Sequence, residues 1–304
     1  MKSNYRYIVK AFMAMAVIAG TTSCDDFLDR EPMSSISPET YYSTAAQLEA
    51  NLNDEYPNVL PSFGQWTYGI FGEDKGTDNQ IEVNANDRYT QDRWKVPHSE
   101  SDNWKFERIY RINFFLSEAL PKFGEDMSGS QNTISGSVAT IKHYIGEMYF
   151  LRAYEYFKKL QLFGDFPIID QPLADEMEAL REASKRFPRN EVARFIISDL
   201  DKAYAYMSDV DMATTRINKD AAMLVKSRVA LFEATWLQNF KGTAFVPGGE
   251  GWPGASLHNN YQYPSGNLDN EVKYFLEQAV EASKLVADKY KGNLTENTGV
   301  LQPV

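Results

Sequence analysis

The sequence feature that most constrains this chain is a long stretch, 138–163, in which apolar residues recur at the spacing of an α-helix. The residues of this apolar face are Ile141, Ile145, Met148, Leu151, Tyr154, Phe157 and Leu160. Gly164 follows the face and can end the helix. A face this wide has to dock on other elements, so the stretch predicts the strongest helix of the chain, with its aromatic rings in a packed core.

Helical periodicity recurs in five other segments. The expected helices are 38–52, 104–120, 190–207, 218–237 and 269–290. Ser37 with Pro38 should begin the first, Pro121 should end the second, and Asn190, Asn218 and Asp269 should cap the last three. The starts near 138 and 190, and near 218 and 269, repeat an offset of about 52 residues. The expected fold class is mainly α, with tetratricopeptide-like helical hairpins and long aromatic-rich loop insertions.

The first 23 residues have the organisation of a secretion signal. Lys2, Arg6 and Lys10 precede an apolar run, and the only cysteine, Cys24, follows a short stretch of small residues. The apolar run of about 10 residues would rise only about 15 Å as a helix, half of a bilayer core, so it is not expected to span a membrane. We therefore expect a lipoprotein signal peptide at 1–23, lipidation at Cys24, a tether at 24–37 and the folded domain at 38–304.

The charge balance excludes one class of partner. The chain carries 31 Lys and Arg against 42 Asp and Glu, and loss of residues 1–23 would leave 28 basic residues and a net charge of −14. Nucleic acid is a poor partner for such a chain, because its phosphates need a basic face. Neutral sugars remain compatible, and membrane contact is expected through the lipid anchor.

Two loop regions hold residues that suit a sugar site. Sugar binding needs aromatic faces that stack on pyranose rings and polar groups that pair with hydroxyls. In segment 57–103, which Pro and Gly interrupt, the candidate ligand-binding residues are Trp66, Tyr68, Asp78, Asn79, Arg88, Trp94 and Asn103. Segment 240–263 adds Trp252, His258, Tyr261 and Tyr263. For each of these the competing interpretation, a side chain packed on its own loop, stays open.

The stretch from Gly146 to Ile169, GEMYFLRAYEYFKKLQLFGDFPII, resembles the signature helix and turn of SusD-like proteins. In that family an Arg-Ala-Tyr-x-Tyr-Phe helix is closed by Phe-Gly-Asp-x-Pro. Three further pieces agree in order, and they lie at 23–32, at Pro188-Arg189 with 196–200, and at 216–222 leading to 226–231. Asp165, within the turn, is expected to accept hydrogen bonds from nearby backbone N–H groups.

The resemblance implies a mostly helical lipoprotein on the outside of the outer membrane. Such a protein lies over a TonB-dependent, SusC-like transporter, binds a glycan and delivers it without being an enzyme, and the helical hairpins would contact the transporter. Family members are normally longer than this chain, so the chain is expected to be truncated at its C-terminus. The sequence does not identify the glycan.

Two other classes of function compete with glycan capture. The first is a tetratricopeptide-like adaptor that holds a protein partner. Solvent-facing Trp66, Trp94 and Trp252 would favour sugar, whereas buried ones would favour the adaptor. The second is a glycoside hydrolase, which needs two opposed carboxylates. An acidic cluster could supply such a pair, but acidic loops are usually solvated, so no catalytic residue is assigned; the cluster comprises Glu73, Asp74, Asp78 and Glu82.

No metal site or cofactor is expected. His98, His143 and His258 do not stand in ligand spacing, and the only cysteine is expected to carry lipid. Residues 249–254 satisfy G-x-G-x-x-G, but no strand precedes them and Pro253 is unsuited to a phosphate-binding helix start. Calcium in an acidic loop stays open, although no EF-hand pattern supports it.

Overall fold

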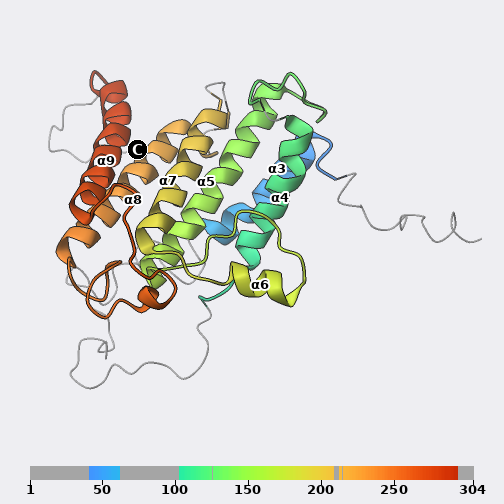
Figure 1. Cartoon of the computed structure of the whole chain (residues 1–304). Helices are drawn as coiled ribbons and strands as arrows, with labels where there is room; N and C mark the ends of the chain where they lie inside the picture. Colours follow the sequence, from blue (N-terminus) through green and yellow to red (C-terminus); the bar gives the residue numbers. More distant parts are fainter. Residues whose placement is uncertain (1–40, 62–102, 125, 209–211, 214, 294–304) are drawn as a thin grey trace, which may run out of the picture. The chain divides into compact units, whose positions relative to one another are not determined.

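Helix α5 (Val138–Phe163) is the element around which the fold is built, and it lies in the middle of a row of helices (Figure 1). The computed structural model describes residues 41–61, 103–124, 126–208, 212–213 and 215–293. Ser137 caps α5 by accepting a hydrogen bond from the Thr140 N–H, and the chain leaves the helix at Gly164 with φ 67°. Because 17 of its 26 residues are buried, α5 is covered around most of its circumference. Both predicted ends of this helix are confirmed.

The other long helices pack in succession on either side of α5 (Figure 1). Helices α3 (Ala45–Val59) and α4 (Glu107–Phe123) pack against α5, as does α7 (Arg189–Tyr206). Helix α8 (Lys219–Asn239) packs on α7, and α9 (Leu268–Tyr290) packs on α8. The predicted pairs, α5 with α7 and α8 with α9, are therefore in direct contact. That the pairs have tetratricopeptide geometry stays a prediction.

The mainly α class is confirmed. Outside the helices, the described residues contribute two isolated β-bridges, Thr44 with Ser135 and Phe166 with Phe187. Periodicity does not predict two short elements that the structure contains, α6 (Met177–Ala183) and the 3-10 helix η3 (Pro253–Ser256). In the part of the chain that the structure describes, every helix is too short or too polar to cross a bilayer.

Two helices run past a proline, and at one of these prolines, Pro121, the sequence predicts the end of the helix. Pro57 lies inside α3 and Pro121 inside α4, each in the last turn. A proline so close to the end of a helix removes one intrahelical hydrogen bond and leaves the rest of the ladder intact. The prediction that Pro121 ends its helix is therefore wrong, and Gly124 ends it instead.

The structure also corrects several of the predicted helix starts. Ser37 and Pro38 lie outside the described residues, but the first described helix begins at Ala45, after a capping box between Thr44 and Gln47. Asn218 caps α8 as predicted. Asn267, not Asp269, caps α9, because its side chain accepts from the Asn270 N–H at 2.8 Å. Helix α7 begins after Pro188, with no side-chain cap, and Asn190 is used elsewhere.

Candidate functional site

Most of the sugar-binding candidates lie outside the described residues. The candidates outside the described residues are Trp66, Tyr68, Asp78, Asn79, Arg88 and Trp94. The expected lipidation site Cys24 also lies outside them, as do Glu73, Asp74 and Glu82 of the acidic cluster. Asn103, the last candidate of this segment, is exposed, and its backbone carbonyl accepts a hydrogen bond from Lys159 Nζ at 2.7 Å. The assignment of these residues to a ligand site therefore stays a prediction.

Trp252 is placed differently from the expectation of an exposed platform ring. Its side chain is 5% exposed, and its indole N–H donates to Asp165 Oδ2 at 2.7 Å. The close approach of Gly254 contributes to this burial, since a Cβ atom there would lie 2.2 Å from the indole ring. Trp252 thus packs inside its own loop, and the prediction that its face is open to a sugar is corrected.

Asp165 ties the loop that carries Trp252 to the end of α5. Its Oδ1 accepts from the backbone N–H of Arg189 at 2.9 Å, while Oδ2 accepts from the indole. Burial raises the pKa of Asp165, although these two donors and the nearby arginines oppose the rise. Asp165 has a structural role, as predicted, but its backbone donor is Arg189, 24 residues further along the chain, and not an N–H group of its own turn, and its partner Trp252 was not foreseen.

Tyr261 holds the same loop to α7 and α9. Its hydroxyl accepts from Asn190 Nδ2 at 2.9 Å, and Asn190 Nδ2 also lies 3.0 Å from Glu271 Oε1. Arg194 completes the cluster, with Nε and Nη2 at 2.7 and 2.8 Å from the two oxygens of Glu271. Burial raises the pKa of Tyr261 well above its usual range. Tyr261 therefore anchors a loop, and His258 does likewise through a contact of 2.8 Å with the Arg186 carbonyl.

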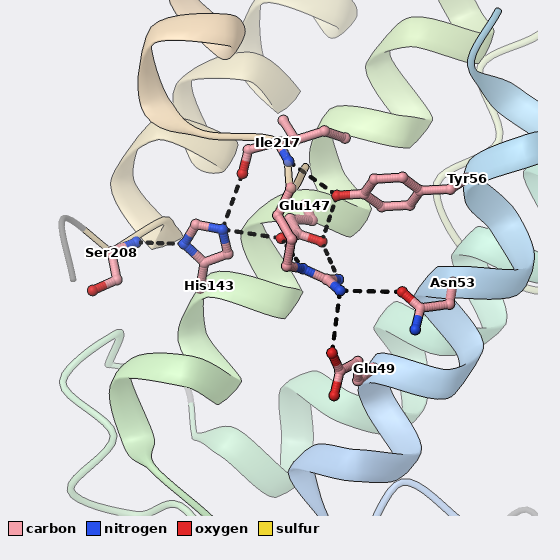
Figure 2. Close-up of polar contacts among 8 residues, drawn as sticks. Glu49, Asn53, Tyr56, His143, Glu147, Ser208 and Ile217 are labelled. Atoms are coloured by element: carbon pink, nitrogen blue, oxygen red, sulfur yellow. Dashed lines mark hydrogen bonds and ion pairs between the residues drawn. The ribbon is translucent and has the colours of Figure 1, made fainter. Parts of the chain in front are cut away.

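A buried polar cluster joins α3, α5 and the segment before α8, and Figure 2 shows it in detail. Glu147 of α5 accepts from Arg216 Nε and Nη2 at 2.8 and 2.6 Å and from the Tyr56 hydroxyl at 2.8 Å. The Tyr56 hydroxyl in turn accepts from the Ile217 N–H at 3.1 Å. Arg216 also reaches the polar side chains of Glu49 and Asn53. Burial and the neighbouring Glu147 raise the pKa of Tyr56, which stays a neutral donor.

His143 belongs to this cluster, and its hydrogen bonds define its tautomer (Figure 2). Its Nδ1 accepts from the Ser208 N–H at 3.1 Å, so Nδ1 carries no proton. Its Nε2 lies 3.0 Å from both the Ile217 carbonyl and Glu147 Oε1, so it donates to them. Among the described residues no cluster of His, Cys, Asp and Glu could hold a metal ion. The cluster is a structural tie, because its carboxylate is fully engaged by donors.

Two further buried ion pairs explain why charged residues stand in the motif pieces. Arg152 of α5 pairs with Asp199 of α7, and Arg189 pairs with Glu233 of α8 at 2.8 Å. Burial raises the pKa of Glu233, although Arg189 opposes the rise. The sequence does not show which residues pair with each other, since each charge stands in an otherwise apolar helical stripe. A charged residue within an apolar stripe does indicate that a buried partner exists, because a charge is rarely buried unless it is paired.

One shallow groove in the described part of the chain presents an open aromatic ring. It lies between α4, the segment after Ile169, and α6, has a volume of about 240 Å³, and is lined by Phe106, Ile109, Tyr110, Gln171 and Leu180 among others. The Tyr110 side chain is 52% exposed and stacks on Phe114 with ring centroids 6.1 Å apart. Such a groove can take the apolar face of a small ring, with an amide at its edge. Tyr110 lies off the apolar stripe of its helix, a signal that the sequence interpretation did not use.

These features define a mainly α protein of serially packed helices, in which buried ion pairs join one helix to the next. The chain belongs to the SusD-like family. The family model that matches residues 26–231 is SusD-like_3, described as starch-binding associating with outer membrane. The resemblance of the signature helix and turn is thereby confirmed.

Curated relatives and solved structures of this family resemble the chain over part of their length. SusD-like protein P2 of Formosa agariphila is 25% identical over 253 residues, which are 79% of this chain and 46% of that protein. SusD-like protein P25 of the same organism is 25% identical over 70% of this chain and 41% of its own length. A SusD-like carbohydrate binding protein from Bacteroides vulgatus aligns with TM-score 0.44 and 15% identity, over 84% of this chain and 47% of that one. The chain thus spans less than half the length of these relatives.

Proposed function

We propose that this protein is a cell-surface lipoprotein that binds an oligosaccharide or polysaccharide and delivers it to a TonB-dependent, SusC-like transporter of the outer membrane. The observation that carries the proposal is the match of residues 26–231 to a family described as starch-binding and associated with the outer membrane. Signal-like residues 1–23 and Cys24 support anchoring through a lipid. In this proposal the protein holds its ligand and catalyses no reaction.

The proposed contacts with the glycan come from the long segment between α3 and α4. Its aromatic residues would stack on sugar rings and its polar residues would pair with hydroxyls; the proposed residues are Trp66, Tyr68, Asp78, Asn79, Arg88, Trp94 and Asn103. Trp252 and Tyr261 take a supporting role, because one is buried and the hydroxyl of the other is bonded to Asn190. Tyr110 offers a separate open ring.

Native affinity electrophoresis of the full chain in detergent tests the proposal. Gels would contain soluble starch, a β-glucan, xylan, mannan or pectin, and Trp66→Ala, Trp94→Ala and Tyr110→Ala would run beside the wild type. We expect one polysaccharide class to retard the wild type and a Trp66 or Trp94 variant to lose that retardation. Tyr204→Ala removes a partly exposed ring from α7 and serves as the matched control. Retardation by none of the gels would remove the proposal.

A second candidate, a protein-binding adaptor, is favoured by one observation. Trp252 is buried, as expected of an adaptor rather than of a platform that uses this ring. The serial packing of α5, α7, α8 and α9 supplies the kind of helical scaffold that such a protein needs. In this case no gel retards the chain, and purified SusC-like transporter binds it equally with and without glycan.

A further inference from the structure

The open groove between α4, the segment after Ile169 and α6 (the Tyr110 groove; Figure 1) has one wall that the core holds in place. The Tyr156 hydroxyl accepts from the Ile169 N–H at 2.8 Å and donates to the Ile169 carbonyl at 3.0 Å. Asn113 Nδ2 donates to the same carbonyl at 2.8 Å, and Arg152 Nη1 donates to the carbonyl of the next residue at 3.0 Å. All three of these side chains are buried. The main chain along this wall is therefore fixed before any ligand arrives.

An aromatic ring with an open side forms the facing wall. Tyr110 stacks on Phe114 with ring centroids 6.1 Å apart and an angle of 24° between the rings, while its side chain is 52% exposed. Phe114 thus sets the direction of the Tyr110 ring and leaves part of its surface to solvent. The buried side chain of Ile109 lines the groove between the two walls. A ring supported in this way can stack on the apolar face of a flat ligand with little rearrangement.

The rim of the Tyr110 groove carries an amide and a carboxylate. Gln171 and Asp175 line the groove, and in the part of the chain that the structure describes neither side chain has a hydrogen-bond or ion-pair partner. Both side chains are therefore available to pair with the hydroxyl groups of a ligand. The charge of Asp175 disfavours an anionic ligand, because like charges repel.

The size of the Tyr110 groove fits one ring. Its volume is about 240 Å³, below the roughly 300–1,000 Å³ of sites that enclose drug-sized ligands. Helix α6 bounds the groove with Leu180, which is 40% exposed, and none of the residues of α6 is buried. The dimensions therefore suit a single ring that keeps one edge in solvent, as a terminal or branching residue of a polymer does.

We propose that the Tyr110 groove is a second carbohydrate site, which binds one neutral pyranose ring. The choice of a sugar as the ligand rests on the proposed function, whereas the groove is formed entirely by α4, the segment after Ile169 and α6. The apolar face of the pyranose stacks on Tyr110, and its hydroxyls pair with Gln171 and Asp175. A uronic acid is rejected by the charge of Asp175.

Saturation-transfer NMR on the full chain tests this site, in a detergent without a sugar headgroup. The probes are the methyl glycosides of glucose, mannose, galactose and xylose, with methyl galacturonate as the anionic probe and p-cresol as the apolar one. Tyr110→Ala removes the ring, Ala174→Trp fills the groove, and Tyr110→Phe removes only the hydroxyl. Tyr204→Ala removes a partly exposed ring from α7 and is the matched control. Thermal unfolding checks that each variant is folded.

We expect transfer to at least one neutral methyl glycoside, with a dissociation constant on the order of 1 mM, as for a ligand of one ring. Tyr110→Ala and Ala174→Trp should weaken this binding about tenfold or more, because the stacking surface is lost or covered. Tyr110→Phe and Tyr204→Ala should match the wild type, since the first keeps the stacking ring and the second lies elsewhere. The galacturonate should bind more weakly than the galactoside.

Transfer to no neutral glycoside, or transfer that Ala174→Trp leaves unchanged, would overturn the inference. Transfer to p-cresol alone would also overturn it and would assign the groove to an apolar side chain of a partner protein. The polysaccharide gels described above separate this inference from the proposed function. If a gel retards a wild type that binds no glycoside, the proposed function stands and this site falls. If glycoside binding is lost in Tyr110→Ala but no gel retards the wild type, the site stands and the proposed function falls.

Discussion

Arg152 of α5 and Asp199 of α7 form a two-pronged ion pair in the core, with Nε 2.6 Å from Oδ2 and Nη2 2.8 Å from Oδ1. The pair is almost wholly buried, and the remaining Arg152 nitrogen donates to Asn113 of α4 at 2.9 Å. One guanidinium therefore joins three helices. It also joins two of the motif pieces on which the family resemblance rests, since Arg152 stands in one and Asp199 in the other.

Removal of one partner should be costly. Asp199→Ala leaves the Arg152 cation buried without its counter-charge, and we expect a loss of about 3–5 kcal/mol in the free energy of unfolding. The double variant Arg152→Met, Asp199→Leu should recover most of that loss, because it leaves no buried charge unpaired. Urea unfolding measures both. The matched control is Glu277→Ala, which breaks an exposed pair with Lys273 and should cost less than about 1 kcal/mol. Equal losses of stability in Asp199→Ala and Glu277→Ala would contradict the conclusion that the buried pair stabilises the core.

Gly146 sets the separation of α5 and α7. A Cβ atom at this position would lie 2.8 Å from the Met207 nitrogen and 3.0 Å from the Ala203 carbonyl oxygen, both backbone atoms that cannot swing away. Although alanine favours helix, Gly146→Ala should therefore lose about 1–3 kcal/mol in the free energy of unfolding. Gly292→Ala is the control, since nothing lies within 4 Å of its added Cβ. A Gly146→Ala variant as stable as the wild type in urea would show that the helices can separate freely.

Glu271 should make stability depend on pH. Burial raises its pKa, but hydrogen bonds from Arg194, Asn190 and the Ser265 N–H outweigh burial and lower the pKa below 4.5 overall. A lowered folded-state pKa adds stability above the unfolded value, and this contribution is lost as pH falls through the folded-state pKa. Glu271→Gln should therefore cost about 2–3 kcal/mol at pH 7 and progressively less below about pH 4.5, as urea midpoints across pH would record. A cost that does not change with pH would contradict the charge argument.

His143 should be observed as the Nε2–H tautomer. Its Nδ1 is occupied as an acceptor by the Ser208 N–H, and its Nε2 faces the Ile217 carbonyl and Glu147. Long-range proton–nitrogen correlation spectra separate a protonated ring nitrogen from an unprotonated one. We expect one nitrogen of each kind, with the proton on Nε2. The opposite tautomer would mean that Ser208 is not the donor to this ring.

Trp252→Phe tests whether this ring supports the fold. The change keeps an apolar ring but leaves Asp165 Oδ2 without its indole donor in a buried position. A lost partner of a buried acceptor costs about 1–3 kcal/mol, so we expect that decrease in the free energy of unfolding. Polysaccharide retention should stay at the wild-type level under conditions where the variant is folded. Loss of retention in a variant of unchanged stability would return Trp252 to the ligand site.

The helices could be predicted because their signals are local. Ser137 and Gly164 both lie at the ends of α5, so the sequence alone contains what begins and ends that helix. The helix end predicted at Pro121 was wrong because a proline in the last turn, where both Pro57 and Pro121 lie, removes one hydrogen bond and leaves the rest of the ladder intact. Periodicity detects apolar faces, and it has no means of showing which distant segment supplies the partner of a buried charge such as Arg152.

The candidate site was harder to predict for the same reason. An aromatic residue in a polar loop gives the same sequence pattern whether its ring faces solvent or packs under the loop. The ring of Trp252 packs under the loop. What decided its placement is Asp165, which lies 87 residues earlier in the chain. A pairing over that distance depends on how α5, α7 and α8 are packed, and this information appears only when the chain is folded.

The position of α5 in the row of helices has a consequence for the growing polypeptide. Its Tyr156 packs on Phe195 with ring centroids 4.9 Å apart, and its Tyr149 packs on Tyr206 at 5.7 Å, so both partners are synthesised after it. A nascent chain that has grown only to the end of α5 holds a helix with one covered side and one aromatic side in water. Such intermediates aggregate or are bound by chaperones. Biosynthesis should therefore be most vulnerable to interruption between residues 163 and 206.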